Sequence, residues 1–277
     1  MSPLQQSIET IFAAAAPQPP ADFQQVFNEM IRQLNSGELR AAYCNGTAWR
    51  VNEWVKKGIL LGFRYGKLTD YSSGMFPYFD KDTYPLQSTT IQQKIRIVPG
   101  GSSIRNGSFL APGVVIMPPA YVNVGSYVDA DTMIDSHALV GSCAQIGKRV
   151  HLSAGVQIGG VLEPIGARPV IIEDDVLIGG NCGIFEGVLI KRGAVLAAGT
   201  ILTASLPVYD LIRQEVLKGN KKQPLVIPEN AVVIPGSRPL IKSGFARHHG
   251  LHGYCAVIIK YRDSDTDTAT ALEKSLR

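Results

Sequence analysis

The sequence predicts a mainly β protein whose centre is a coil of short parallel strands. An aliphatic residue returns at every sixth position from Val98 to Ile158, and the same spacing resumes from Ile172 to Leu202. The third residue after each aliphatic is often Gly, Asn or Asp, and the fourth is small or β-branched. Gly, Asn and Asp tolerate the positive φ of a tight corner. A six-residue repeat of short strand and corner therefore predicts a solenoid with an aliphatic core.

Residues 1–94 predict an N-terminal helical domain and a connection to the coil. Apolar residues recur at helical spacing in residues 2–16, from about residue 21 to 35, and in 53–63. Asn45-Gly46 predicts a hairpin over residues 41–51, because Asn-Gly favours a two-residue turn.

Residues 65–93 show no stable period and predict a loop-rich segment. Its aromatic cluster of Phe76, Tyr78 and Phe79 is expected to pack against the solenoid or against a neighbouring molecule.

The repeat region, residues 95–235, is interrupted twice. The spacing from Ile158 to Ile172 exceeds two repeats by two residues, which predicts an external loop near 159–170. A polar insertion is expected near 203–226. Residues 236–277 are expected to form a cap on the open end of the coil, with a strand over 253–261 and a helix over 268–277.

Composition narrows the class of protein. The 277 residues carry a formal charge of only +4, which gives no reason to expect a nucleic-acid partner. The four cysteines are scattered without metal-finger spacing, so no disulfide framework or metal site is expected, and a cytoplasmic location is favoured. No stretch is long and apolar enough to predict a membrane span. Residues 1–16 carry Glu9 and lack a basic start, which favours a helix over a signal peptide.

Four segments of the coil carry a more specific pattern. They are residues 121–125, 133–153, 159–164 and 171–174. In these segments the chain resembles the tetrahydrodipicolinate N-succinyltransferases, which are hexapeptide-repeat acyltransferases. The resemblance implies a left-handed parallel β-helix and a homotrimer with active sites between neighbouring subunits. It also implies succinyl-CoA and a dicarboxylate as substrates, with no tightly bound cofactor.

The resemblance assigns roles to three residues. Arg96 matches the family's substrate-binding arginine, and a planar guanidinium suits a carboxylate. Asp135 matches the family's substrate-contacting aspartate, which could accept a hydrogen bond from the substrate amine or take its proton. Glu186 matches an acidic residue that serves as general acid during imine hydration and ring opening. The chain departs from the family pattern at Gly183, where many members carry a second glutamate.

Candidate CoA-binding residues rest on charge and position. They are Gly179, Gly180, Lys191, Lys221 and Lys222. Each has a simpler explanation, since exposed lysines are usually solvated and corner glycines need no ligand.

Several other functions remain open on the sequence alone. The donor could be acetyl-CoA, or His137 or His151 could be the base of an O-acyltransferase. A zinc carbonic anhydrase would need three imidazoles around an open coordination position, and no closely spaced coil pair accompanies a third histidine. A non-catalytic interaction solenoid would not require Arg96 and Asp135 together.

Overall fold

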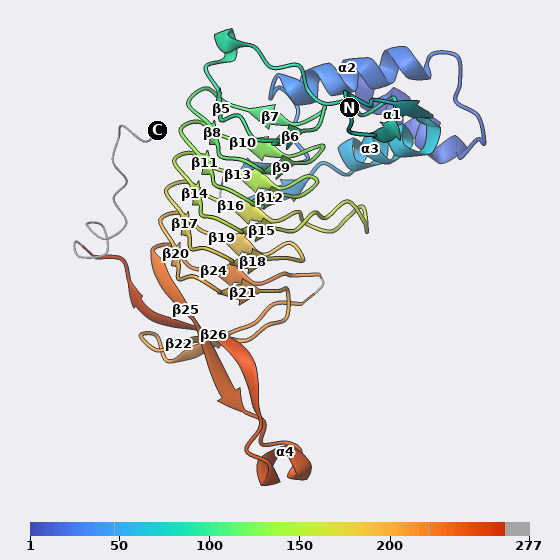
Figure 1. Ribbon diagram of the computed structural model, residues 1–277. Helices are drawn as coiled ribbons and strands as arrows, with labels where there is room; N and C mark the ends of the chain where they lie inside the picture. Colours follow the sequence, from blue (N-terminus) through green and yellow to red (C-terminus); the bar gives the residue numbers. More distant parts are fainter. Residues whose placement is uncertain (47, 221, 264–277) are drawn as a thin grey trace.

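The centre of the protein is a left-handed parallel β-helix with a small helical region at its N-terminal end, as the sequence predicted (Figure 1). The computed structural model describes residues 1–46, 48–220 and 222–263. Most strands of the coil contain two residues. Each pairs in parallel with the strand on the same face one coil before it and one coil after it.

The three faces of the coil are three parallel sheets. Sheet 1 contains β5 (Arg96–Ile97), β8 (Val115–Ile116), β11 (Met133–Ile134), β14 (His151–Leu152), β17 (Leu177–Ile178) and β20 (Val195–Leu196). Sheet 2 contains β6 (Ser103–Ile104), β9 (Tyr121–Val122), β12 (Leu139–Val140), β15 (Gln157–Ile158), β18 (Gly183–Ile184) and β21 (Ile201–Leu202). Sheet 3 contains β7 (Phe109–Leu110), β10 (Tyr127–Val128), β13 (Gln145–Ile146), β16 (Ile171–Ile172), β19 (Leu189–Ile190) and β24 (Val226–Ile227).

The sixfold aliphatic residues point inward and form one continuous core from Ile104 to Leu202. The first rung differs from the prediction, because β5 pairs Ile97 with Ile116 and leaves Val98 outside the ladder. The turn that follows β5 holds one residue more than the later regular turns. Its glycines at 100 and 101 have φ of 143° and 90°, which side chains disfavour. The ladder therefore starts one residue earlier than predicted.

Three corners join the sheets. Corner 1 leads from sheet 1 to sheet 2, corner 2 from sheet 2 to sheet 3, and corner 3 from sheet 3 to the next strand of sheet 1. Residues 159–170 leave corner 2 between β15 and β16, and residues 203–225 leave it between β21 and β24. Neither departure breaks the ladder, since β16 pairs with β13 and β24 pairs with β19.

The predicted N-terminal helices and hairpin are confirmed. They are α1 (Pro3–Ala14), α2 (Phe23–Asn35), the antiparallel strands β1 (Ala42–Asn45) and β2 (Ala48–Val51), and α3 (Glu53–Tyr65). The apolar core of the helices includes Val124 and Cys143, which lie on corner 2. A Cβ on Gly125 would come within 2.8 Å of the Ile59 side chain, so α3 lies directly against the coil. The helices thus cover the upper part of corner 2 (Figure 1).

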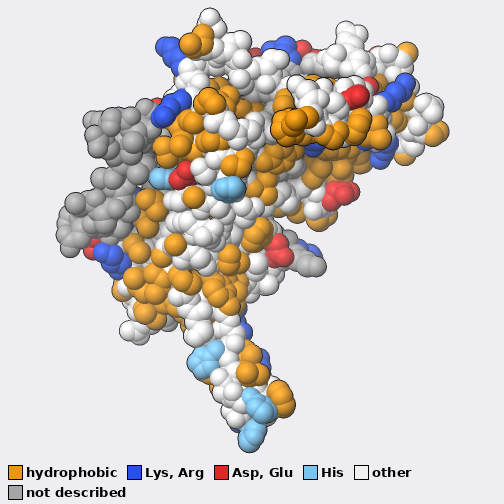
Figure 2. All heavy atoms as spheres, viewed as in Figure 1, with side chains coloured by type: hydrophobic (Ala, Val, Ile, Leu, Met, Phe, Trp, Pro, Cys, Tyr) orange, Lys and Arg blue, Asp and Glu red, His pale blue; other side chains and the backbone are white. Residues whose placement is uncertain are grey.

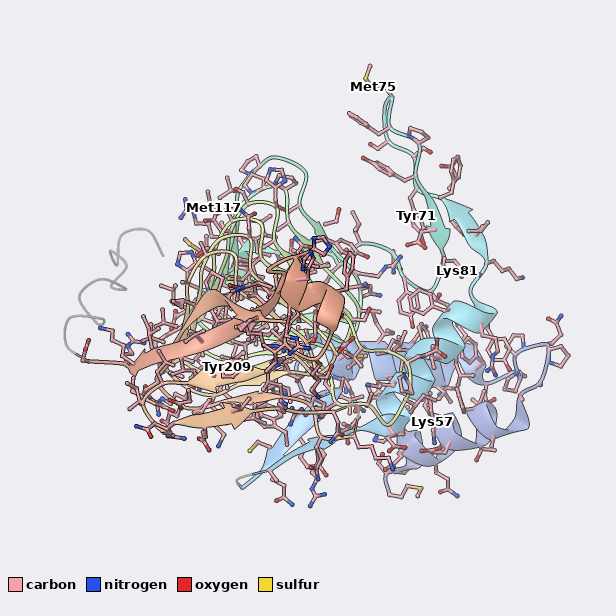
Figure 3. The ribbon with its side chains drawn as sticks, turned by 90° about the horizontal axis from the view of Figure 1, so that it is seen from below. Lys57, Tyr71, Met75, Lys81, Met117 and Tyr209 are labelled. Carbon is pink, nitrogen blue, oxygen red and sulfur yellow. The ribbon has the colours of Figure 1, made fainter. Side chains whose placement is uncertain are left out.

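The segment predicted as loop contains an antiparallel hairpin of β3 (Leu68–Asp70) and β4 (Phe79–Lys81), followed by the short 3-10 helix η1 (Ile91–Gln93). The hairpin projects from the molecule with Met75 at its end (Figure 3). Phe76, Tyr78 and Phe79 are 60%, 56% and 66% exposed. The expectation that they pack against the chain's own solenoid is therefore wrong, because the hairpin carries them away from it. Contact with a neighbouring molecule stays a prediction.

The C-terminal end extends sheet 1. The added strands are β25 (Ala231–Pro239), β26 (His252–Tyr261), β22 (Val208–Asp210) and β23 (Glu215–Leu217). Strand β25 crosses the expected boundary at residue 235, and the insertion supplies β22 and β23. The β25–β26 hairpin projects beyond the coil and carries α4 (Gly244–His248), where histidines gather beside hydrophobic side chains (Figure 2). The helix expected over 268–277 lies outside the described residues. Within the described chain, the helices are all too short or too polar to cross a membrane.

Candidate active site

Arg96 and Asp135 lie on the same side of the prism. Arg96 is exposed on β5, and the residues at its position on the next two strands are Val115 and Met133. Since stacked strands lie about 4.8 Å apart, Arg96 is about 10 Å from Met133 along the coil. Asp135 follows β11 directly, at corner 1. The structure thus places these two predicted site residues on one side of the prism, two strands of sheet 1 apart.

Asp135 lies beside an imidazole. Its Oδ1 accepts the backbone N–H of Ser136 at 2.7 Å, and its Oδ2 lies 4.0 Å from His151 Nε2. The His151 side chain is 14% exposed and stands between Met133 and Leu177 on the outer face of sheet 1. A carboxylate beside a largely buried imidazole is an arrangement that can accept and hold a proton.

On the sequence alone, His151 is a candidate base of an O-acyltransferase or one imidazole of a zinc site, and nothing links it to Asp135. The coil period contains the missing signal: His151 follows Met133 by eighteen residues, which is one full coil, so it stacks on the strand that precedes Asp135.

Glu186 occupies an unusual turn at corner 2, after β18. Its φ is 54° and that of Gly187 is 73°, so two successive residues are left-handed. The exposed Glu186 side chain accepts the backbone N–H of Ala204 at 3.0 Å, which ties the turn to the start of the insertion. A non-glycine residue with positive φ is costly and persists where its surroundings enforce it. The turn therefore holds the Glu186 carboxylate in a defined place.

Phe185 gives a physical reason for the departure at Gly183. A Cβ on Gly183 would lie 2.5 Å from the Phe185 ring, and a Cβ on Gly159 would lie 2.8 Å from it. The ring fills the space that a glutamate at 183 would need, so such a glutamate would displace Phe185.

A groove of about 630 Å³ lies beside this turn, between the external loop and the coil. Its lining is mostly apolar, with two carboxylates. The lining residues are Gly159, Gly160, Val161, Glu163, Pro164, Ala167, Phe185, Glu186, Thr203 and Ala204. The external loop, the Glu186 turn and the insertion thus meet at corner 2, although they lie far apart in sequence.

The candidate CoA residues do not form one cluster. A Cβ on Gly179 would lie 2.5 Å from the backbone nitrogen of Ala198, so the packing of the next coil already explains that glycine. Gly180 lies beside it at corner 1. Lys191 is exposed at corner 3, and Lys222 is exposed in the insertion. Lys221 lies outside the described residues.

The site residues therefore fall into two groups on one chain. Arg96, Asp135 and His151 belong to sheet 1 and corner 1, whereas Glu186 and the groove belong to corner 2. Glu186 follows β18, two coils beyond the coil of Asp135 and across the full width of sheet 2. One chain alone does not bring Asp135 and Glu186 together.

Two family models match the chain. The model described as tetrahydrodipicolinate N-succinyltransferase N-terminal covers residues 3–65, and the one described as hexapeptide repeat of succinyl-transferase covers residues 169–204. A 2,3,4,5-tetrahydropyridine-2,6-dicarboxylate N-succinyltransferase of Chromobacterium violaceum is 43% identical over 285 aligned residues, which span 100% of this chain and 99% of that protein. The chain belongs to the tetrahydrodipicolinate N-succinyltransferase family. The resemblance that the coil motifs indicated is confirmed.

Two other enzymes with this name are also similar to this chain along nearly its whole length. The enzyme of the same name from Alkalilimnicola ehrlichii is 44% identical, with both chains fully covered, and that of Neisseria meningitidis is 42% identical over 99% of this chain and 98% of its own. Among solved structures, a putative 2,3,4,5-tetrahydropyridine-2-carboxylate N-succinyltransferase from Campylobacter jejuni matches with a TM-score of 0.50 at 17% identity. That match covers 84% of this chain and 62% of the other, and it supports the fold alone.

Proposed function

We propose that the protein transfers a succinyl group from succinyl-CoA to tetrahydrodipicolinate, a step towards diaminopimelate and lysine. The observation that carries this proposal is the similarity, along the full length of the chain, to enzymes named for that reaction. Water adds to the cyclic imine and opens the ring to an amine. The amine nitrogen then bonds to the thioester carbonyl carbon, the C–S bond breaks, and N-succinyl-2-amino-6-oxopimelate and CoA are released.

The residues of sheet 1 suit the acceptor. The Arg96 guanidinium can bind a substrate carboxylate through paired hydrogen bonds. Asp135 Oδ2 can accept the proton that the amine loses when it attacks the thioester. His151 stands next to this oxygen and would share the proton or fix the orientation of the carboxylate.

The groove at corner 2 suits the donor. Its apolar walls fit the uncharged pantetheine arm and thioester better than the CoA phosphates, which Glu163 and Glu186 would repel. In this proposal Glu186, whose carboxyl group is held by the Ala204 N–H, would act as the general acid for hydration and ring opening.

We further propose that the active site forms between subunits of a homotrimer in the cytoplasm. In a parallel assembly, corner 1 of one chain can face corner 2 of its neighbour, which would unite Asp135 with Glu186. The separation of these residues on one chain supports this arrangement. In this proposal the division into a helical domain (1–94), a β-helix (95–235) and a cap (236–277) is kept as an approximate one, because β25 (Ala231–Pro239) runs from the second part into the third.

One assay tests the proposed reaction. Purified, chelator-treated protein is mixed with succinyl-CoA, and the released thiol is followed with and without tetrahydrodipicolinate. Release that depends on tetrahydrodipicolinate is expected. A strong preference for acetyl-CoA would assign the acetylating reaction instead, and release with a sugar or serine would assign an O-acyltransferase.

A zinc carbonic anhydrase would need three imidazoles around one metal ion. Within the part of the chain that the structure describes, no three metal-ligating side chains gather at one place.

A further inference from the structure

Lys56 is a fully buried lysine whose ammonium donates a hydrogen bond to the external loop. It lies on α3 with no exposed surface, and its Nζ donates to the carbonyl oxygen of Ala167 at 2.5 Å. Ala167 lies in the external loop and lines the groove at corner 2. Burial lowers the pKa of Lys56, because an ammonium is poorly stabilised away from water. Burying a cation costs free energy, which suggests that the hydrogen bond to the Ala167 carbonyl has a function.

Arg168 holds the same stretch of loop from the other side. Its Nε donates to the carbonyl of Gly187 at 2.9 Å, and its Nη2 donates to the carbonyls of Pro224 and Leu225 at 3.2 and 3.4 Å. The partner of Arg168 on the coil is therefore the left-handed turn that carries Glu186. Burial also lowers the pKa of Arg168.

Two consecutive loop residues are thus fixed by cationic side chains. The start of the loop is held differently, by the backbone N–H of Val161, which donates to the carbonyl of Ser142 at 3.2 Å. Figure 1 shows the loop leaving the coil on the side where α3 lies. A loop held at both ends presents its groove-facing residues in one position.

We propose that Lys56 and Arg168 are positioning residues that fix residues 159–170 over the groove and so set the binding of the thioester end of succinyl-CoA. This inference rests on the proposed function, in which the groove receives the donor. In this proposal neither Lys56 nor Arg168 contacts the substrate. The N-terminal helical domain thereby acts on the active site through Lys56, in addition to covering the coil.

The test compares two neighbouring lysines of α3. Lys56→Met keeps the length and apolar character of the side chain but removes the donor, and replacing a buried ion by a hydrophobe usually preserves folding. Lys57→Met is the matched control, because the Lys57 Nζ instead pairs with Glu9 of α1 at 2.6 Å (Figure 3). Hydrogen exchange of residues 159–170, measured without substrate, and the kcat and KM for succinyl-CoA are the readouts.

We expect Lys56→Met to speed exchange across the loop about tenfold and to lower kcat/KM for succinyl-CoA about tenfold, mainly by raising KM, because small displacements of a positioning element can cost up to about a hundredfold. Arg168→Met should act in the same direction, with an added loss in kcat because the Glu186 turn loses its support. Lys57→Met should change neither readout.

Wild-type exchange at residues 159–170 in both Lys56→Met and Arg168→Met would overturn the proposal, as would an equal loss of kcat/KM in Lys57→Met. Failure of the wild-type protein to transfer succinyl would instead overturn the proposed function, and the exchange comparison would still decide whether the loop is held by these residues.

Discussion

Corner 1 and corner 2 of the β-helix are made from the same six-residue repeat but are used differently. Along corner 1 the turns after the first hold four residues each, and Asp135 is a side chain added to one of these regular turns. Corner 2 carries the external loop, the insertion, the left-handed turn at Glu186 and the packing surface for the helices. A regular corner can carry a partly exposed acid, whereas the groove at corner 2 is built by segments that extend outward from the coil.

The largest effect is expected at corner 1, from Asp135→Asn. If Asp135 takes the amine proton, kcat should fall at least about a hundredfold, which is typical for loss of a general base. The matched control is Asp129→Asn, since Asp129 occupies the same repeat position and accepts the N–H of the next residue at 2.8 Å, as Asp135 does at 2.7 Å. Steady-state kinetics would measure both. A near-normal rate for Asp135→Asn would remove its catalytic role.

A second experiment compares the two corners through glycines. Gly187 at corner 2 and Gly199 at corner 1 have φ of 73° and 76°. A Cβ at 187 would lie 2.3 Å from the Arg168 carbonyl oxygen, while a Cβ at 199 would meet nothing within 4 Å. Gly199→Ala should cost about 1 kcal/mol of stability for the backbone alone. Gly187→Ala should cost about 1–3 kcal/mol more, because its surroundings must shift.

Urea unfolding at a fixed protein concentration would measure both glycine variants. Equal costs would show that corner 2 adapts to a methyl group as easily as corner 1.

The pH dependence of the unfolding free energy tests whether the Lys56 ammonium is destabilised by burial beneath corner 2. Burial lowers the folded-state pKa of Lys56 below its unfolded value of about 10.4. Below both values the folded state carries the cost of a buried ammonium, and that cost fades as pH rises through the folded pKa. The unfolding free energy of the wild type, minus that of Lys56→Met, should therefore increase with pH up to about 10.4. A difference that stays flat with pH would contradict the buried, destabilised ammonium.

The smallest effect concerns thiols. Cys143 lies fully buried at corner 2 beneath the helices, where burial raises its pKa to about 12, whereas Cys44 is exposed on β1. At pH 8 an alkylating reagent should modify the native protein at Cys44 and leave Cys143 intact, because the thiolate is the reactive form. Mass spectrometry with Cys44→Ser as control would show this. Rapid labelling of Cys143 would mean that the helices leave corner 2 open.

The sequence predicted the coil and the place of both interruptions because the sixfold spacing is a strong, local signal. It predicted the three N-terminal helices because apolar residues recur there at helical spacing. It missed the first rung, since Ile97 and Val98 are both suitable core residues and only the extra turn residue decides between them. It missed the β3–β4 hairpin because that hairpin has few buried residues to create a pattern. Contacts such as Asp135 with His151 depend on which residues stack one coil apart.

The separation of Asp135 from Glu186 was also missed because it depends on the position of each residue within the coil. Both residues follow an inward aliphatic of the repeat, and the repeat alone does not state which corner each occupies. Counting residues modulo eighteen assigns the corners, and that count must be restarted after residues 159–170.

The placement of both interruptions at corner 2 also bears on how the chain folds. Neighbouring strands of a regular coil are 18 residues apart, as Tyr127 and Gln145 are, but the separation is 26 from Gln145 to Ile171 and 37 from Leu189 to Val226. Because closure entropy grows only with the logarithm of length, these longer closures cost about 0.3 and 0.6 kcal/mol more than a regular coil. Beyond the first interruption, β19, β20 and β21 again pair with strands 18 residues before them. A coil of this kind can therefore gain loops along one corner with only a small added entropy cost of folding.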